Sequence, residues 1–222
     1  MNYLERSREF WVTASKFPLN KEDVYPTHAK AHNFDRHHGV TYLEYGVGAG
    51  SDCLSALRRG NYVYATDIVP ENVKVATKNV EEAKYSDHCT VLLLEESARI
   101  PLPSESIDVI NCHGTLHHIK DPEPVLREFY RLLKPGGMLY CMLYSEVMWM
   151  HFQTRISQLC IEKQISPFEA FCHCTDSGGP YAKPYTEGEA FDLFEKAGFL
   201  VENVVSYGEL KDFFRTYWCR KE

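Results

Sequence analysis

The sequence predicts one α/β domain built on a doubly wound, mostly parallel β-sheet with helices on both faces. Short apolar runs alternate with amphipathic runs from residue 41 to about residue 145. A glycine-rich turn follows the first apolar run, and Asp67 stands at the end of the second. A glycine turn and a carboxylate at the ends of neighbouring parallel strands are typical of a nucleoside site at the carboxyl edge of the sheet.

Composition narrows the class of protein. The chain has 222 residues, enough for one sizeable core, so we expect a single domain over residues 1–222. Its net charge of −7 offers no cationic surplus for phosphates, which argues against a nucleic-acid partner. No run approaches the ~20 apolar residues that span a bilayer, and residues 1–6 are not a signal peptide. The oligomeric state stays open.

Cysteine usage favours a reducing, cytoplasmic location. Six of the eight cysteines stand singly, and no C-x-x-C pair occurs. The run Cys172-His173-Cys174 is the exception, but C-x-C is not a usual zinc spacing and no second pair exists. We interpret these two thiols as buried or half-buried side chains of a lid. No clustered Asp/Asn set follows the sheet, so no metal is expected.

Residues 1–40 are predicted to form an N-terminal helical cover. Phe10 and Trp11 are candidates to fold over a bound ligand and exclude water from it. Four histidines follow, and we expect them to be solvated or locally hydrogen-bonded: His28, His32, His37 and His38.

Residues 41–145 are predicted to be the ligand-binding core. Its strands are expected at 41–45, 62–66, 90–94, 107–112 and 138–144. Residues 70–84 place apolar side chains on one helical face. A second helix opens at Asp121-Pro122 and is ended by Lys134-Pro135-Gly136-Gly137.

Residues 146–185 break the alternation and are interpreted as a lid or acceptor-pocket insertion. Its aromatic cluster around Trp149 and Phe152 is either a wall of that pocket or ordinary core. Residues 186–222 then supply a C-terminal helix and strands. The helix begins at a capping box, Thr186-Glu187-Gly188-Glu189, and residues 200–207 follow as a strand.

The glycine turn has the spacing G-x-G-x-G at Gly46, Gly48 and Gly50, which lets the backbone pass close to a ligand. Ser51 occupies the last glycine position of the dinucleotide fingerprint, which disfavours NAD. Glu44 would repel a pyrophosphate but attract the ammonium and sulfonium of S-adenosylmethionine.

Asp67 lies at the end of the second predicted strand, where a carboxylate can accept both ribose hydroxyls. The alternative is that Asp67 only caps the helix ahead of Pro70.

Five motifs in order give the chain a family resemblance. It resembles the class I S-adenosylmethionine-dependent methyltransferases, in the style of the small-molecule group that includes the ubiquinone/menaquinone methyltransferases. The fold this implies is Rossmann-like, with about seven strands. The resemblance covers 41–145 strongly and 185–207 loosely, and its motifs are residues 43–50, 66–68, 96–103 with 107–108, 111–118 and 133–137.

The resemblance also implies roles for individual residues. The methionine end of the cofactor would lie against Glu44, Gly46, Gly48, Ala49, Gly50 and His113. Asp67 and Ile68 would hold ribose and adenine, and Glu96 with Ser97 would meet the adenine edge. Glu96 departs from the family pattern, which has a short Asp or Asn there.

Methyl transfer from a sulfonium mainly requires alignment of nucleophile, carbon and sulfur. A base is needed only when the acceptor arrives protonated. His113, His117 and His118 are candidates, with His118 first; alternatively they cap the turn or contact the cofactor. The leading hypothesis is methylation of a small-molecule acceptor. A protein or RNA methyltransferase, a Rossmann oxidoreductase and a catalytically silent partner subunit remain as alternatives.

Overall fold

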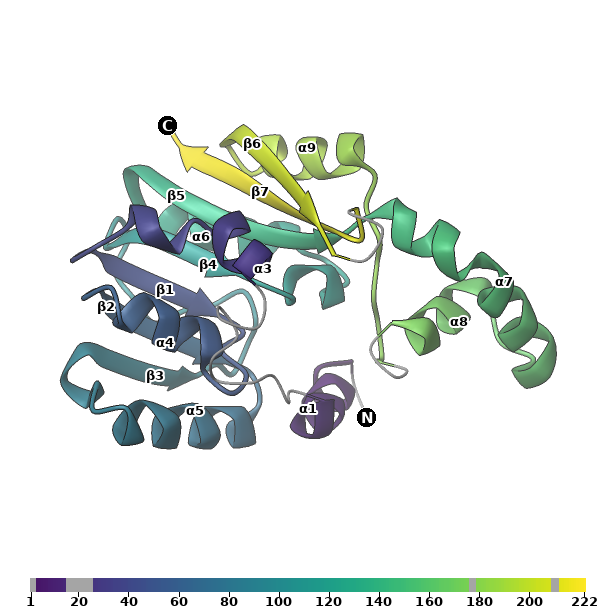
Figure 1. Ribbon diagram of the computed structural model, residues 1–222, viewed down its shortest axis with the longest axis horizontal. Helices are drawn as coiled ribbons and strands as arrows, with labels where there is room; N and C mark the ends of the chain where they lie inside the picture. Colours follow the sequence, from purple (N-terminus) through teal and green to yellow (C-terminus); the bar gives the residue numbers. More distant parts are fainter. Residues whose placement is uncertain (1–2, 15–25, 176–178, 209–211) are drawn as a thin grey trace.

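The computed structural model describes residues 3–14, 26–175, 179–208 and 212–222. These residues form a seven-stranded sheet with the order β3-β2-β1-β4-β5-β7-β6 (Figure 1). All pairs are parallel except β5 with β7 and β7 with β6. The predicted doubly wound, mostly parallel sheet is therefore confirmed. The strands are β1 (Thr41–Tyr45), β2 (Tyr62–Asp67), β3 (Cys89–Leu93), β4 (Ile107–Cys112), β5 (Leu133–Tyr144), β6 (Phe199–Tyr207) and β7 (Phe214–Lys221).

Helices cover both faces of the sheet because successive strand residues point to opposite faces. Tyr42 of β1 packs with α4 and α5, whereas Leu43 packs with α6 and α9. The helices of the described residues are α1 (Tyr3–Ala14), α3 (Pro26–Ala31), α4 (Ser51–Leu57), α5 (Pro70–Glu82), α6 (Glu123–Leu132), α7 (Glu146–Lys163), α8 (Pro167–Cys174) and α9 (Glu187–Lys196), with the 3-10 turns η1 (Phe34–Arg36), η2 (Ser86–His88) and η3 (Leu116–His118).

Local sequence signals place several of these boundaries. Pro70 occupies the first turn of α5, where its missing N–H costs nothing. The predicted capping box at Thr186 is confirmed, since its hydroxyl accepts from the Glu189 N–H at 3.2 Å and the Glu189 carboxylate accepts from the Thr186 N–H at 2.9 Å.

The strand expected at 138–144 begins earlier than predicted. Leu133 already pairs with Ile107, and regular pairing resumes at Met138 opposite Val109 after an irregularity. Residues 134–137 therefore form a turn within β5 rather than a loop ahead of it.

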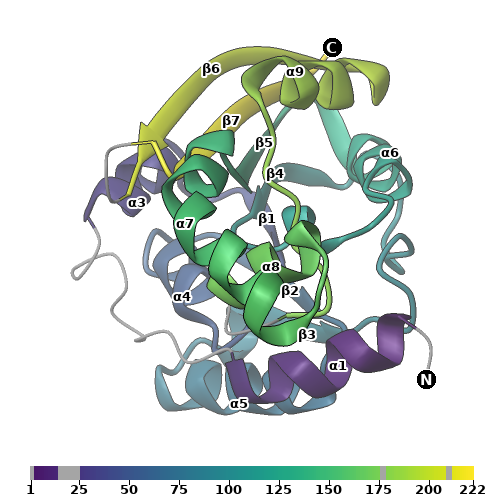
Figure 2. The same cartoon turned by 90° about the vertical axis from the view of Figure 1, so that its right-hand side faces the viewer.

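Helices α1, α7 and α8 lie beyond the carboxyl ends of the parallel strands (Figures 1 and 2). In Figure 2, α7 and α8 lie in front of the central strands, and α1 lies in front of α5. Across the described ranges, no helix has both the length and the apolar character needed to cross a bilayer.

Candidate functional site

A cavity of about 810 Å³ opens at the carboxyl ends of β1, β2 and β4. This is the edge where ligands bind in open parallel sheets, and the volume falls in the range of small-molecule sites. The loops after these three strands supply most of its floor, and α1 contributes to its wall.

The glycine turn between β1 and α4 forms one part of the wall. Gly46 has a φ of 82°, and a Cβ added there would lie 2.1 Å from the Thr115 hydroxyl oxygen. Gly48 has a φ of 52°, again in the left-handed region. Gly46, Gly48 and Ala49 line the cavity, whereas Gly50 lies behind the wall as the residue that caps α4.

Asp67 lies on the cavity wall next to this turn. Its carboxylate accepts hydrogen bonds from the backbone N–H of Gly48 at 3.0 Å and of Val69 at 2.9 Å. The Asn72 side-chain amide donates a third at 3.2 Å. Burial raises the pKa of the Asp67 carboxyl, and these three donors oppose that shift. Asp67 thus orders the turn before α5 and also faces the cavity, as does Ile68.

The loop after β3 provides a further part of the wall. Ser97 and Leu94 line the cavity, and the Tyr45 hydroxyl donates to the Ser97 carbonyl at 2.7 Å. Glu96 is exposed and lies outside the lining. The placement of Glu96 at the adenine edge stays a prediction, whereas Ser97 takes the inner position of this loop.

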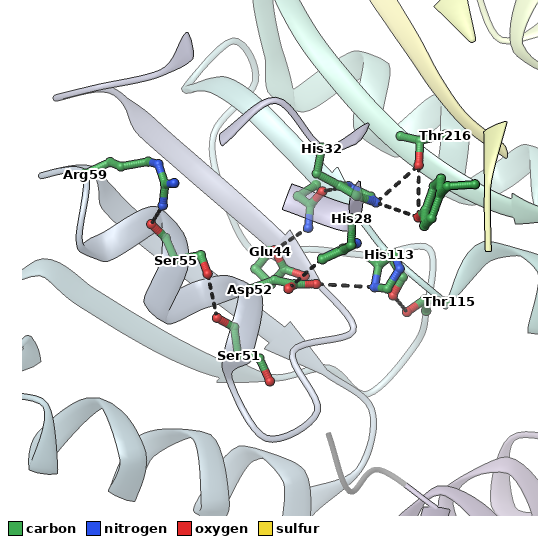
Figure 3. Close-up of polar contacts among 12 residues, drawn as sticks. His28, His32, Glu44, Ser51, Asp52, Ser55, Arg59, His113, Thr115 and Thr216 are labelled. Atoms are coloured by element: carbon green, nitrogen blue, oxygen red, sulfur yellow. Dashed lines mark hydrogen bonds and ion pairs between the residues drawn. The ribbon is translucent and has the colours of Figure 1, made fainter. Parts of the chain in front are cut away.

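Two buried carboxylates lie at the deep end of the cavity (Figure 3). Glu44, only 2% exposed, accepts from the Asn111 side-chain amide at 2.8 Å. Asp52, 7% exposed, contacts His28 Nε2 at 2.9 Å and His113 Nδ1 at 3.3 Å. The sequence analysis missed Asp52, although its place in the first turn of α4 after the glycine turn was a signal.

The expectation of solvated histidines is wrong for His28 and His32, which are 3% and 0% exposed. Helix α3 carries His28 inward, His32 follows its last residue, and the Trp218 indole N–H fixes this helix by donating to the Ala31 carbonyl at 2.7 Å. His38 behaves as expected, since it is exposed and contacts the nearby Asp35 carbonyl at 3.0 Å. His37 does not, since it is half-buried and contacts the Tyr140 hydroxyl of β5 at 2.7 Å.

The three candidate bases occupy different environments. His113 and His118 line the cavity, whereas His117 does not. His117 is fully buried and stacked on Tyr144 at 3.7 Å, and burial holds its pKa well below the usual value. His118 Nδ1 contacts the Tyr181 carbonyl at 2.8 Å, and its ring lies 4.6 Å from that of Trp11. A carbonyl can only accept, so Nδ1 of His118 carries the hydrogen.

The N-terminal cover reaches the cavity through α1. Trp11 lines it together with Tyr3, whereas Phe10 packs edge-on against Trp11 behind the lining. Arg8 ties α1 to the sheet edge, since its guanidinium donates to the Ile68 carbonyl at 2.8 Å and to the Leu94 carbonyl at 3.0 Å.

The remaining wall is apolar and comes from the ends of β5, β6 and β7. Met142, Tyr144, Tyr207 and Phe214 form it. No described residue of 146–185 lines the cavity, and the role of this segment as a lid or acceptor-pocket insertion stays a prediction.

The apolar side chains of residues 146–185 pack in one cluster with Met142, Tyr144 and Tyr207, which are residues of the cavity wall. Trp149 packs on Phe171 at 5.0 Å, and Met150 is 58% exposed. Cys172 is buried and Cys174 half-buried, which confirms the interpretation of these thiols.

Comparison with known proteins agrees with this geometry. Residues 43–141 match the methyltransferase domain family. This chain contains a class I S-adenosylmethionine-dependent methyltransferase domain.

Curated relatives of this methyltransferase domain include the ubiquinone biosynthesis O-methyltransferase of Xanthomonas oryzae pv. oryzae, 36% identical over 102 residues. That match covers 46% of this chain and 42% of the relative. The enzyme of the same name from Xylella fastidiosa is 34% identical over 103 residues, and the match covers 46% of this chain and 41% of the relative. The chain therefore spans less than half the length of these relatives.

Solved structures share the fold of the methyltransferase domain. The 1,6-didemethyltoxoflavin-N1-methyltransferase of Burkholderia thailandensis superimposes with a TM-score of 0.68 at 16% identity, covering 99% of this chain and 88% of that one. A SAM-dependent methyltransferase from Aquifex aeolicus gives a TM-score of 0.64 at 22% identity, with coverage of 93% and 100%.

Proposed function

We propose that this domain binds S-adenosylmethionine in the cavity and transfers its methyl group to a small-molecule acceptor. The observation that carries the proposal is the position of Asp67, whose carboxylate stands on the cavity wall beside a glycine turn that no side chain blocks. A ribose at this point would find a carboxylate acceptor for its hydroxyls.

The charges of the cavity fit the cofactor. Glu44 and Asp52 are buried carboxylates at its deep end, close to the glycine turn. Ion pairs in a poorly solvated site are screened less than in water, so these groups attract the ammonium and sulfonium of the methionine portion. A nicotinamide dinucleotide would bring its pyrophosphate to the same turn, where the two carboxylates repel it.

The apolar end of the cavity fits a small, flat acceptor. Tyr144, Tyr207 and Phe214 present aromatic rings to it, with Met142 beside them. Aromatic walls bind planar apolar molecules through contact area and ring stacking. An enclosed site of this kind suits a small molecule better than a protein or RNA surface. The name of the ubiquinone O-methyltransferase relatives points to the same acceptor class.

The protein aligns the cofactor and the acceptor, excludes water from them and supplies a base. The bound cofactor provides the electrophilic methyl group, and α1 excludes water above it through Trp11. His118 donates Nδ1–H to the Tyr181 carbonyl, which leaves Nε2 as the proton-accepting atom of the neutral ring. We assign His118 Nε2 the removal of the acceptor proton when the acceptor arrives protonated.

Isothermal titration with S-adenosylmethionine and S-adenosylhomocysteine tests the cofactor assignment. One equivalent of each should bind, and NADH should not. Absence of binding for both sulfur ligands would remove the proposal. Acceptors can then be screened by release of S-adenosylhomocysteine. His118→Gln should keep cofactor affinity and lower turnover of a protonated acceptor by about 10²–10⁴.

A further inference from the structure

Three histidines converge at the deep end of the cavity. His28 lies on α3, and His32 directly follows the last residue of this helix, where its backbone N–H donates to the His28 carbonyl at 3.0 Å. His113 follows β4 (Figure 3). One ring nitrogen of each lies within 4.8 Å of one ring nitrogen of each of the others. The ring centroids of His28 and His113 are 4.0 Å apart, and those of His28 and His32 are 4.5 Å apart.

Each of these rings is oriented by an oxygen. His28 Nε2 and His113 Nδ1 contact the two oxygens of Asp52, at 2.9 Å and 3.3 Å. His32 Nδ1 contacts the side-chain oxygen of Asn111. A neutral imidazole that donates from one nitrogen presents a lone pair on the other. The lone pairs then lie on Nδ1 of His28 and on Nε2 of His32 and His113. The hydroxyl oxygens of Thr216 and Tyr207 contact His32 Nε2 at 3.3 Å and 3.5 Å, so these hydroxyls must turn away before His32 can bind an ion.

This pattern is the one that surrounds histidine ligands of metal ions. Such ligands donate their second N–H to a carboxylate or amide oxygen, which fixes the tautomer and makes the ligating nitrogen more basic. Asn111 is itself held by Glu44, whose carboxylate accepts from the Asn111 amide at 2.8 Å. Each of the three rings is therefore backed by an oxygen of Asp52 or of the Asn111–Glu44 pair.

The charge of this region also favours a cation. Two buried carboxylates lie close to the three rings. Asp52 contacts His28 and His113 directly, and Glu44 is linked to His32 through the Asn111 side chain. Buried negative charge is costly unless a positive charge offsets it. A divalent ion between the imidazoles would balance both carboxylates.

We propose that His28, His32 and His113 bind a divalent transition-metal ion next to the cavity. Imidazole nitrogens suit Zn²⁺, Co²⁺ or Ni²⁺, whereas Mg²⁺ and Ca²⁺ require oxygen ligands. Zinc–nitrogen bonds are about 2.0–2.1 Å long, so the rings close toward one another when the ion enters. His28 and His113 line the cavity, so a fourth coordination position is open to an oxygen or thiol of a bound molecule. This site shares Glu44, Asp52 and His113 with the pocket proposed for the cofactor, and metal titration without S-adenosylmethionine tests it separately from methyl transfer.

Metal titration of the full-length, metal-stripped chain tests the site. Co²⁺ should bind with one equivalent, give the visible absorption of a four-coordinate nitrogen/oxygen site, and be displaced by Zn²⁺. A thiolate-to-cobalt band in the near ultraviolet would place the ion at cysteines such as Cys172 and Cys174 and overturn the proposal. Absence of stoichiometric binding to the wild type would overturn it too.

Single variants locate the ion. His28→Gln and His113→Gln should each weaken Co²⁺ binding at least 100-fold, and Asp52→Asn should weaken it about 10–100-fold. His173→Ala, in the cysteine-flanked run, is the matched control and should bind as the wild type does. Circular dichroism of the metal-free variants checks folding. If one glutamine variant fails to fold, the proposal is tested by Co²⁺ binding to the other variant and by the Co²⁺ absorption spectrum of the wild type. Undiminished binding by the folded glutamine variants would overturn the proposal.

Discussion

The carboxylate of Asp67 accepts a hydrogen bond from the backbone N–H of Gly48, with an N–O distance of 3.0 Å. This bond joins the end of β2 to the glycine turn after β1. Both of these cavity-lining segments are therefore held in one arrangement before a ligand arrives. Pre-ordering of this kind reduces the entropy that binding must remove.

Asp67→Asn should weaken binding of S-adenosylhomocysteine. Hydrogen bonds to a charged group contribute about 1.5–3 kcal/mol, so the dissociation constant should rise about 10–150-fold. The new amide also turns an NH₂ group toward an existing donor. Isothermal titration measures the change. Asp87→Asn alters an exposed aspartate on η2 and should leave affinity unchanged. Equal affinity of both variants would show that Asp67 does not contact the ligand.

Gly46→Ala should disrupt the turn itself. The added Cβ would lie 2.1 Å from the Thr115 hydroxyl oxygen, at a φ of 82° that L-residues rarely adopt. Either the glycine turn or the loop after β4 must move, so cofactor binding should fall by more than tenfold. Gly188→Ala is the control, because no atom lies within 4 Å of its added Cβ. Helix α9 should tolerate that change or gain stability. Wild-type affinity in Gly46→Ala would contradict this account.

Arg8→Ala should loosen the cover formed by α1. The guanidinium donates to the Ile68, Leu94 and Glu95 carbonyls at 2.8 Å, 3.0 Å and 3.1 Å, and these hydrogen bonds hold the helix to the sheet edge. We expect S-adenosylhomocysteine to dissociate about tenfold faster, with little change in thermal stability. Stopped-flow displacement measures the rate. Arg6→Ala changes an exposed arginine of the same helix and should match the wild type. A similar rate for both variants would exclude an anchoring role.

The sequence predicted those parts of the site that depend on local chemistry. The glycine turn and Asp67 stand at strand ends that the apolar alternation already marks, so their neighbourhood follows from parallel pairing. His28 and Asp52 gave no such signal. Their contact joins residues from two helices, and His113 reaches it from a third segment after β4.

The sequence analysis did not find the residues of the apolar cavity wall for a related reason. Aromatic side chains in 146–185 looked suited to a pocket, yet they pack on one another as Trp149 does on Phe171. The wall instead contains Tyr207 and Phe214, which pair with each other across β6 and β7, and the pairing of β7 with β5 places Phe214 next to Tyr144. Sheet order of that kind depends on long-range pairing that no local pattern encodes.

His117→Phe should reduce the acid sensitivity of the fold. Burial depresses the pKa of His117 in the folded protein, and its ring stacks on Tyr144 at 3.7 Å. The unfolded chain takes up a proton below about pH 6.5, whereas the folded protein does not. Folded-state stability contributed by the neutral ring is therefore present above that pH and is lost as pH falls.

Chemical denaturation at pH 7.5 and at pH 5 measures this linkage. The loss attributable to His117 is about 1.4 kcal/mol per pH unit below the unfolded pKa. Phenylalanine keeps the stacked ring and removes the titrating group, so its free energy of unfolding should fall less between the two values. At pH 7.5 the His117 ring is neutral in both the folded and the unfolded protein. The difference in the free energy of unfolding between variant and wild type at this pH therefore reports the change in packing. If the variant and the wild type lose the same free energy on acidification, His117 is not a source of the acid sensitivity.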